Sequence, residues 1–163
     1  MVSFSVRAFL KFWLPPLAWM IFIFLGSTDL LSAEHTSRFI GPFLRWLDPN
    51  ISDTTIGSIQ LIVRKCGHLL EYAILAALLY RALATHRDRP FVLAFILAAT
   101  YAALDEFHQS FVASRTGSPW DVVVDCAGAF VGLLFCSLLR NRRNAARKAS
   151  EAGLSKSKFE IRK

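Results

Sequence analysis

Cysteine is scarce in this sequence, and no two cysteines stand close enough to form a CxxC pair. Cys66, Cys126 and Cys136 are the three in a chain of 163 residues, and each lies in an apolar segment. This spacing gives no support to a disulfide framework or a zinc ribbon. We interpret all three as small buried hydrophobic residues. The sequence also lacks an HExxH motif, the pattern that marks the zinc-binding helix of many metallopeptidases.

Regular alternation of polar and apolar residues, which marks a half-buried strand, is missing too. Hydrophobic residues instead make up 54% of the chain, and the mean hydropathy is +0.41. Segments 9–26, 90–108 and 119–139 are apolar over about the 20 residues that a membrane-spanning helix needs. Residues 65–83 form a fourth such segment, with polar residues in its first turns. None has the polar outer face of a soluble bundle, so we predict an all-α membrane protein with four transmembrane helices.

The first apolar segment has a second interpretation as a cleaved signal peptide, because Arg7 and Lys11 precede it. Such a peptide needs small residues just before its cleavage point, and the sequence LLSAEH has Leu31 there. We therefore prefer a transmembrane helix.

Basic residues are distributed unevenly between the loops of these segments. Of 19 Lys and Arg residues, 14 lie in the N-terminal arm, the second loop and the tail that begins at Arg140. Short loops rich in Lys and Arg stay on the cytoplasmic side, so both termini should be cytoplasmic. We expect a multi-pass protein of the inner or plasma membrane, with a transmembrane domain at 1–139 and a basic, flexible cytoplasmic tail at 140–163.

The same tail carries most of the net charge of +7. A basic segment directly after a membrane helix typically contacts anionic lipid head groups. No folded nucleic-acid-binding module accompanies it, so we expect membrane lipids, and no nucleic acid, as partners.

Ionisable residues nevertheless occur within or beside the apolar segments, where each would cost about 2.5 to 3.5 kcal/mol at the bilayer centre. In the predicted topology all of them reach the extracytoplasmic side. At about 100° per residue, Asp121 and Asp125 lie in line with Gly128 and Gly132, small residues that let another helix approach. Convergence on one pocket would relieve the cost of burial. The group comprises Lys65, His68, Glu71, Tyr72, Asp105, Glu106, Gln109, Asp121 and Asp125, with Arg115 in a loop.

Two blocks within these segments resemble the VanZ-like family of small membrane proteins, named for a factor linked to teicoplanin resistance. They are KCGHLLEYAILAALL, from Lys65, and DEFHQSFVASRTGSPWDVVVDCAGAFVG, from Asp105. The resemblance implies four membrane helices, a cell-envelope setting and antibiotic resistance, but no established reaction. Asp125 departs from the family pattern, which commonly has Asn there. The resemblance carries over Lys65, His68, Glu71, Tyr72, Asp105, Glu106, Gln109, Arg115, Asp121 and Gly128.

We interpret the polar group as a pocket that binds or modifies a lipid-linked envelope intermediate or a glycopeptide antibiotic. The alternative is that these side chains only hold the helices together. Lys65 and Arg115 would bind an anionic head group, Arg115 through its forked guanidinium. Candidates for acid, base or polar positioning roles are His68, Glu71, Asp105, Glu106 and Asp121. Ligand-binding candidates are Lys65, Tyr72, Gln109, Arg115 and Asp125.

Three further alternatives stay open. The five catalytic candidates are also nitrogen and oxygen ligands suited to a divalent cation, although we predict no cofactor. A non-enzymatic accessory factor in the envelope or in antibiotic resistance would need no chemistry. Proton- or cation-coupled transport would use the same acids, but the cytoplasmic halves of the segments are apolar and offer no polar path. The sequence fixes neither the oligomeric state nor whether the protein is an enzyme.

Overall fold

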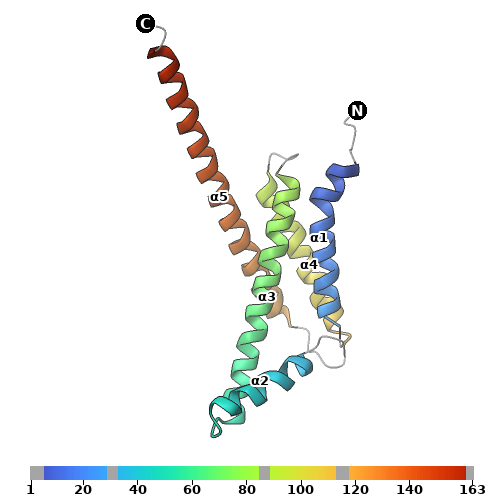
Figure 1. Ribbon diagram of the computed structural model, residues 1–163. Coiled ribbons are helices and arrows are strands. Elements are labelled where there is room, and N and C mark those ends of the chain that lie inside the picture. The colour runs from blue at the N-terminus through green and yellow to red at the C-terminus, as the bar shows by residue number, and fades with distance from the viewer. Residues whose placement is uncertain (1–5, 29–32, 85–88, 113–117, 161–163) are drawn as a thin grey trace. The chain divides into compact units, whose positions relative to one another are not determined.

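The computed structural model describes residues 6–28, 33–84, 89–112 and 118–160. Over these residues the chain forms five α-helices and no strand (Figure 1). The helices are α1 (Val6–Gly26), α2 (Ala33–Leu47), α3 (Asp53–Leu83), α4 (Pro90–Gln109) and α5 (Pro119–Glu160). The predicted all-α class is confirmed.

Three helices in the described part of the chain are long and apolar enough to cross a membrane. They contain residues 9–26 of α1, 90–109 of α4 and 119–151 of α5. This agrees with three of the four predicted spans. The fourth, residues 65–83, lies in α3, which is not among the helices that reach this length and apolarity. Four transmembrane helices and cytoplasmic termini therefore stay predictions.

The candidate spans expose large apolar side chains along their length. Only 11% of the α1 span and 28% of the α4 span are buried within the protein. Ile21 of α1, Ile96 of α4 and Phe130 of α5 are among the exposed side chains. Soluble proteins rarely expose contiguous apolar surface on this scale. Helices that face lipid require it, because hydrocarbon solvates apolar side chains.

Three helix starts carry residues that suit them. Ser52 precedes α3, and its Oγ accepts a hydrogen bond from the backbone N–H of Thr55 at 3.2 Å, which caps the helix. Proline opens both α4 and α5, at Pro90 and Pro119, where its missing N–H has no helical partner to lose. The cap explains why α3 begins at Asp53 and includes residues before the predicted span at 65–83.

The segment between the first two predicted spans was expected to be a loop, but residues 33–47 of it form α2. This helix has 15 residues, with charged and aromatic side chains interspersed and Pro42 within it. A search for long apolar segments does not detect such a short amphipathic helix.

α3 packs against α1, α2 and α4. On α4, Ala94, Ala98 and Ala102 recur every four residues and are fully buried. Such a row of small side chains lets neighbouring helices approach closely. The same face of α4 continues into Asp105 and Gln109, which are also buried.

Gly128 and Gly132 of α5 lie against the backbone of α3. A Cβ atom added at Gly128 would lie 2.9 Å from the Cα and the carbonyl carbon of Leu69, and closer still to its oxygen. A Cβ atom at Gly132 would lie 2.8 Å from the Cα of Ala73. These distances leave no room for a side chain, so the predicted close approach at the two glycines is confirmed.

The predicted burial of the cysteines is wrong for Cys66, which is exposed, whereas Cys126 and Cys136 are partly buried. All three are free thiols. Cys66 lies about 140° around α3 from the midpoint between His68 and Tyr72. Because His68 and Tyr72 are buried, Cys66 is on the opposite, unpacked side of the helix.

Residues 134–163 form a unit separate from residues 1–133. Within it, α5 continues through the basic segment as far as Glu160. Arg147 Nε donates a hydrogen bond to Glu151 Oε1 at 2.8 Å across one helical turn. The sequence did not predict a helix here, and the flexibility expected for residues 140–163 stays a prediction.

Candidate functional site

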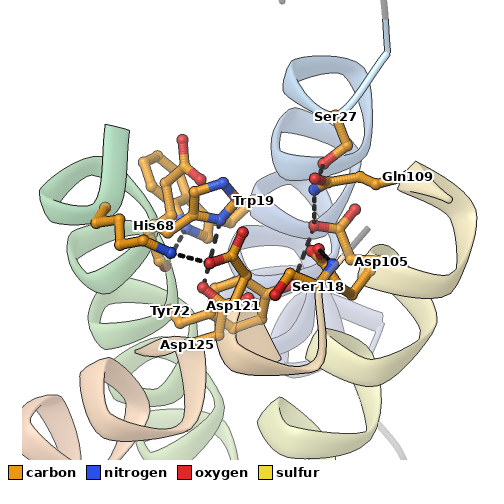
Figure 2. A network of polar contacts seen from close by, with 12 residues as sticks. Trp19, Ser27, His68, Tyr72, Asp105, Gln109, Ser118, Asp121 and Asp125 are labelled. Atoms are coloured by element: carbon orange, nitrogen blue, oxygen red, sulfur yellow. Dashed lines mark hydrogen bonds and ion pairs between the residues drawn. The ribbon is translucent and has the colours of Figure 1, made fainter. Parts of the chain in front are cut away.

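A set of polar side chains is buried where the end of α1, the end of α4 and the start of α5 meet α3 (Figure 2). We call this set the polar cluster. Apart from Lys65 at its edge, its members are between 0% and 8% exposed. The cluster consists of Ser27, Lys65, His68, Tyr72, Asp105, Glu106, Gln109, Asp121 and Asp125.

Two charged contacts join α3 to α5. Lys65 Nζ forms an ion pair with Asp121 Oδ1. About one turn further along both helices, His68 Nδ1 lies 3.3 Å from Asp125 Oδ1. The side chain of Lys65 is 39% exposed, whereas that of Asp125 is 1% exposed. The cluster therefore runs from a half-exposed edge to a fully buried interior.

Asp105 joins α3 to α4, and Gln109 extends this contact to Ser27, just after α1. The Tyr72 hydroxyl of α3 donates a hydrogen bond to Asp105 Oδ2 at 3.3 Å. Gln109 Nε2, one turn further along α4, donates to the same oxygen at 3.1 Å and to Ser27 Oγ at 3.1 Å. Figure 2 shows these side chains converging from the three helices.

Glu106 links the end of α4 to the start of α5. Its Oε1 accepts a hydrogen bond from the backbone N–H of Ser118 at 2.6 Å. The Oγ of Ser118 in turn accepts the backbone N–H of Trp120 at 3.3 Å, as an N-terminal capping residue does. Glu106 therefore helps to fix the first turn of α5, which carries Asp121.

Four buried carboxylate oxygens of the cluster have no hydrogen-bond partner among the residues that the structure describes. They are Asp105 Oδ1, Glu106 Oε2 and both side-chain oxygens of Asp125. Asp125 Oδ1 lies 3.3 Å from His68 Nδ1, but the two atoms are not aligned as a hydrogen bond. A buried polar atom left unsatisfied costs about 1 to 3 kcal/mol, so native proteins satisfy the large majority of them. The described residues supply no hydrogen-bond donor to these four oxygens.

Arg64 belongs to the surroundings of the cluster, although the sequence did not single it out. Its Nη2 atom is buried and has no hydrogen-bond partner within the described ranges. Arg64 and His68 are four residues apart, so they lie on the same side of α3. An arginine just before a predicted span looks like an ordinary loop charge, which is why sequence reasoning missed it.

Three other residues that support the cluster were also missed. Ser27 and Ser118 contribute single hydrogen bonds to Gln109 and Glu106, as described above. Trp19 of α1 donates from Nε1 to the backbone carbonyl of Glu71 at 2.9 Å. Serine and tryptophan are common in membrane segments, and no sequence signal distinguishes these three.

Most of the ten predicted site residues meet in the structure. Seven of them contact one another directly, in the contacts between α3, α4 and α5 given above. Glu106 joins through Ser118, and Glu71 lies half-buried on α3 beside them. Arg115 lies outside the described residues. The catalytic and ligand-binding roles of the ten stay predictions.

A metal centre is not evident in the described part of the chain. No group of three or more His, Cys, Asp or Glu side chains there is arranged to hold a metal ion. The divalent-cation alternative therefore gains no support from these residues. The expectation that the protein has no cofactor stays a prediction.

The contact between His68 and Asp125 has a chemical consequence. An imidazole and a carboxylate side by side can both take part in proton transfer to or from a bound group. Glu71 lies one helical turn from His68 on α3, and the structure adds Asp125 from another helix. The imidazole of His68 and the buried carboxylate of Asp125 thus lie side by side in the cluster.

The exposed apolar spans and the buried polar cluster are the features of a small helical membrane protein. The chain belongs to the VanZ/LLP1 family, whose sequence profile matches residues 12–140. This match covers every member of the polar cluster and confirms the family resemblance inferred from the two sequence blocks. Comparisons with curated proteins and with solved structures gave no match.

Proposed function

We propose that this protein binds the polar head group of a lipid-linked cell-envelope intermediate in the polar cluster, at the extracytoplasmic face of the membrane. The observation that carries this proposal is the set of four buried carboxylate oxygens without partners among the described residues. Helices that are merely held together by polar contacts should satisfy such atoms internally, because each unsatisfied one is costly.

The position of the cluster supports a lipid-linked ligand. It joins the C-terminal ends of two candidate spans, α1 and α4, to the N-terminal start of a third, α5. A head group is found at this depth, at the end of the hydrocarbon region, while its lipid chain lies along apolar helix surfaces. A glycopeptide antibiotic could reach the same face, but the exposed apolar surfaces of α1 and α4 favour a ligand with a lipid chain.

The proposal concerns binding of the head group. Any reaction of the bound head group would depend on His68. A head group held by the unpartnered oxygens of Asp125 would lie close to the imidazole, because Asp125 Oδ1 is 3.3 Å from His68 Nδ1. Proton transfer to or from the bound group is the step that this pair is suited to assist. Without such a step the protein would act as a binding factor for the same molecule.

The proposal is tested by measuring envelope lipid intermediates in cells that lack the protein and are complemented with defined variants. Asp125→Asn removes the charge of the most buried carboxylate while keeping its shape. Asp53→Asn is the matched control, since its side chain is 85% exposed at the start of α3. We expect wild type and Asp53→Asn to restore the same intermediate level and Asp125→Asn to fail.

Folding must be checked in the same cells, by membrane content and by the thermal unfolding of each purified variant in detergent. If a well-folded Asp125→Asn restores intermediate levels as fully as the wild type does, the proposed function is wrong. The same conclusion follows if deletion of the protein changes no envelope lipid.

A further inference from the structure

We infer that the head group recognised by the polar cluster carries a primary ammonium group. This inference rests on the proposed function and specifies its ligand. It differs from the expectation that an anionic head group is bound through Lys65, and two observations lead to it.

The first observation is the balance of charge around the cluster. Among the described residues, which do not include Arg115, five carboxyl side chains lie in or beside the cluster, and two permanent cations and one histidine lie there with them. The acids are Glu71, Asp105, Glu106, Asp121 and Asp125, and the basic residues are Arg64, Lys65 and His68. A phosphate or another anion would add to this excess of negative charge in a poorly solvated place, which is unfavourable. A cationic group reduces it.

The second observation is which polar atoms lack partners. Lys65 is engaged in an ion pair with Asp121, so its charge is already neutralised locally. The four unpartnered carboxylate oxygens can only accept hydrogen bonds when ionised. Two nitrogens of the described cluster region also lack hydrogen-bond partners: Arg64 Nη2, which can only donate, and His68 Nδ1. The site therefore offers an excess of acceptors.

An ammonium group matches these acceptors in number and strength. It is compact and carries three N–H donors, and hydrogen bonds between charged partners are about twice as strong as neutral ones. Asp125 is the central residue, since it is fully buried and both of its oxygens lack hydrogen-bond partners in the described chain. The ammonium would donate to Asp125 and to a neighbouring carboxylate of α4.

The test uses the full-length protein in detergent and three amphipathic sugars with the same alkyl chain. Dodecyl glucosaminide has an ammonium group, its N-acetyl derivative replaces that group with a neutral amide, and dodecyl glucoside replaces it with a hydroxyl. Binding is measured by calorimetry below the micellar concentration of each probe. We expect the glucosaminide to bind about tenfold more tightly or better, the effect of one charge-assisted hydrogen bond.

Variants tie this preference to the cluster. Asp125→Asn should lose the preference for the ammonium, and Asp53→Asn should keep it. If the N-acetyl sugar binds the wild type as tightly as the glucosaminide does, the inference is wrong. If no probe distinguishes the wild type from Asp125→Asn, it is also wrong, and the cellular lipid measurement still decides the proposed function separately.

A different observation concerns α2, and from it we propose that this helix lies in the membrane interface. Phe39, Phe43 and Trp46 are 77%, 57% and 75% exposed. At about 100° per residue they form one stripe about 60° wide. Helices with aromatic residues on one face and charge on another typically lie at the boundary between head groups and acyl chains.

The side of α2 opposite the aromatic stripe contacts α3. Gly41 faces α3, because a Cβ atom there would lie 4.0 Å from Ile56 Cγ2. Arg45, about 40° around the helix from Gly41, forms an ion pair with Asp53 at 2.5 Å. The aromatic stripe thus points neither at α3 nor toward the ion pair.

The chain itself holds α2 close to the membrane surface. The candidate span of α1 ends at Gly26 and α2 begins at Ala33. A connection of this length reaches at most about 25 Å. A helix tethered this close to the end of a membrane span lies near the bilayer interface.

The test places a spin label at Phe43→Cys and, as control, at Arg45→Cys, in protein whose native cysteines are replaced by serine. In liposomes the label at 43 should be more accessible to oxygen, which concentrates in lipid, and the label at 45 to a water-soluble nickel complex. Equal exposure of both labels to the nickel complex would overturn the proposal. So would a label at 43 that is shielded from both reagents and couples to a second copy of the chain.

Discussion

Replacing Gly128 by alanine is the sharpest test of the packing that builds the polar cluster. The added Cβ would lie 2.9 Å from two backbone carbons of Leu69. Ordinary contacts of a Cβ begin at 3.4 Å, and a helix backbone cannot move aside as a flexible side chain can. α5 must therefore shift away from α3 by about half an ångström or more, and overpacking of this kind costs about 1 to 3 kcal/mol.

Gly67→Ala is the matched control, because a Cβ atom at Gly67 has nothing within 4 Å. Alanine favours a helix over glycine by about 1 kcal/mol, and this gain applies to both variants. The difference between their free energies of unfolding therefore isolates the contact with Leu69. We expect Gly128→Ala to be less stable than Gly67→Ala by about 1 to 3 kcal/mol.

The assay is reversible unfolding of the purified protein in mixed micelles with increasing denaturing detergent, followed by circular dichroism. Gly128 lies one turn from Asp125, whose Oδ1 is 3.3 Å from His68 Nδ1, so the shift should also weaken probe binding. If the two variants differ by less than about 0.5 kcal/mol, the usual range for substitutions without special contacts, then α3 and α5 do not approach as closely as described.

Two further predictions concern the cluster and the topology. Tyr72→Phe removes the hydroxyl that donates to Asp105 Oδ2, while Gln109 still donates to that oxygen. We expect a loss of about 0.5 to 1.5 kcal/mol in the same unfolding assay, and no loss would mean that the 3.3 Å contact is not a hydrogen bond. In a cysteine-free background, Ser110→Cys at the end of α4 should react with an impermeant maleimide added outside cells, and Ser150→Cys only after lysis. The reverse pattern would contradict the predicted orientation.

The meeting of these polar residues was predictable from the sequence because two simple constraints act together. Helical spacing places Lys65, His68 and Tyr72 on one side of their segment. Alternating spans bring the end of one apolar segment and the start of the next to the same side of a membrane. Both constraints concern regular geometry, and the observed contacts from α3 to Asp105 and to Asp121 agree with them.

The pairing within the cluster could not be predicted in this way. Whether His68 meets Glu71 of its own helix or Asp125 of another depends on how closely α5 approaches, which Gly128 and Gly132 permit to within a few tenths of an ångström. Spacing along one helix carries no information at that scale. On sequence grounds, the departure of Asp125 from the family pattern makes it a less secure member of the site, yet the residue is fully buried.

α2 and Cys66 escaped prediction for a different reason. Both depend on surroundings that are not encoded locally. α2 is too short and too polar to register as a span, and its helical form is supported by packing on α3. Cys66 lies in an apolar segment, and this composition suggested burial. Its orientation on α3, away from the other described helices, leaves it exposed.

The order of charges along α3 distinguishes a binding site from a purely structural set of contacts. At the edge, Lys65 is 39% exposed and ion-paired with Asp121. About 10 Å further along the helix, at 1.5 Å per residue, Tyr72 reaches Asp105, whose second oxygen has no hydrogen-bond partner in the described chain. Charges that only held helices together should be paired most completely where burial makes an unpaired charge most costly. Here the ion pair of Lys65 is at the exposed edge, whereas the carboxylate oxygens that lack hydrogen-bond partners in the described chain lie deepest, which favours a ligand that supplies the missing donors.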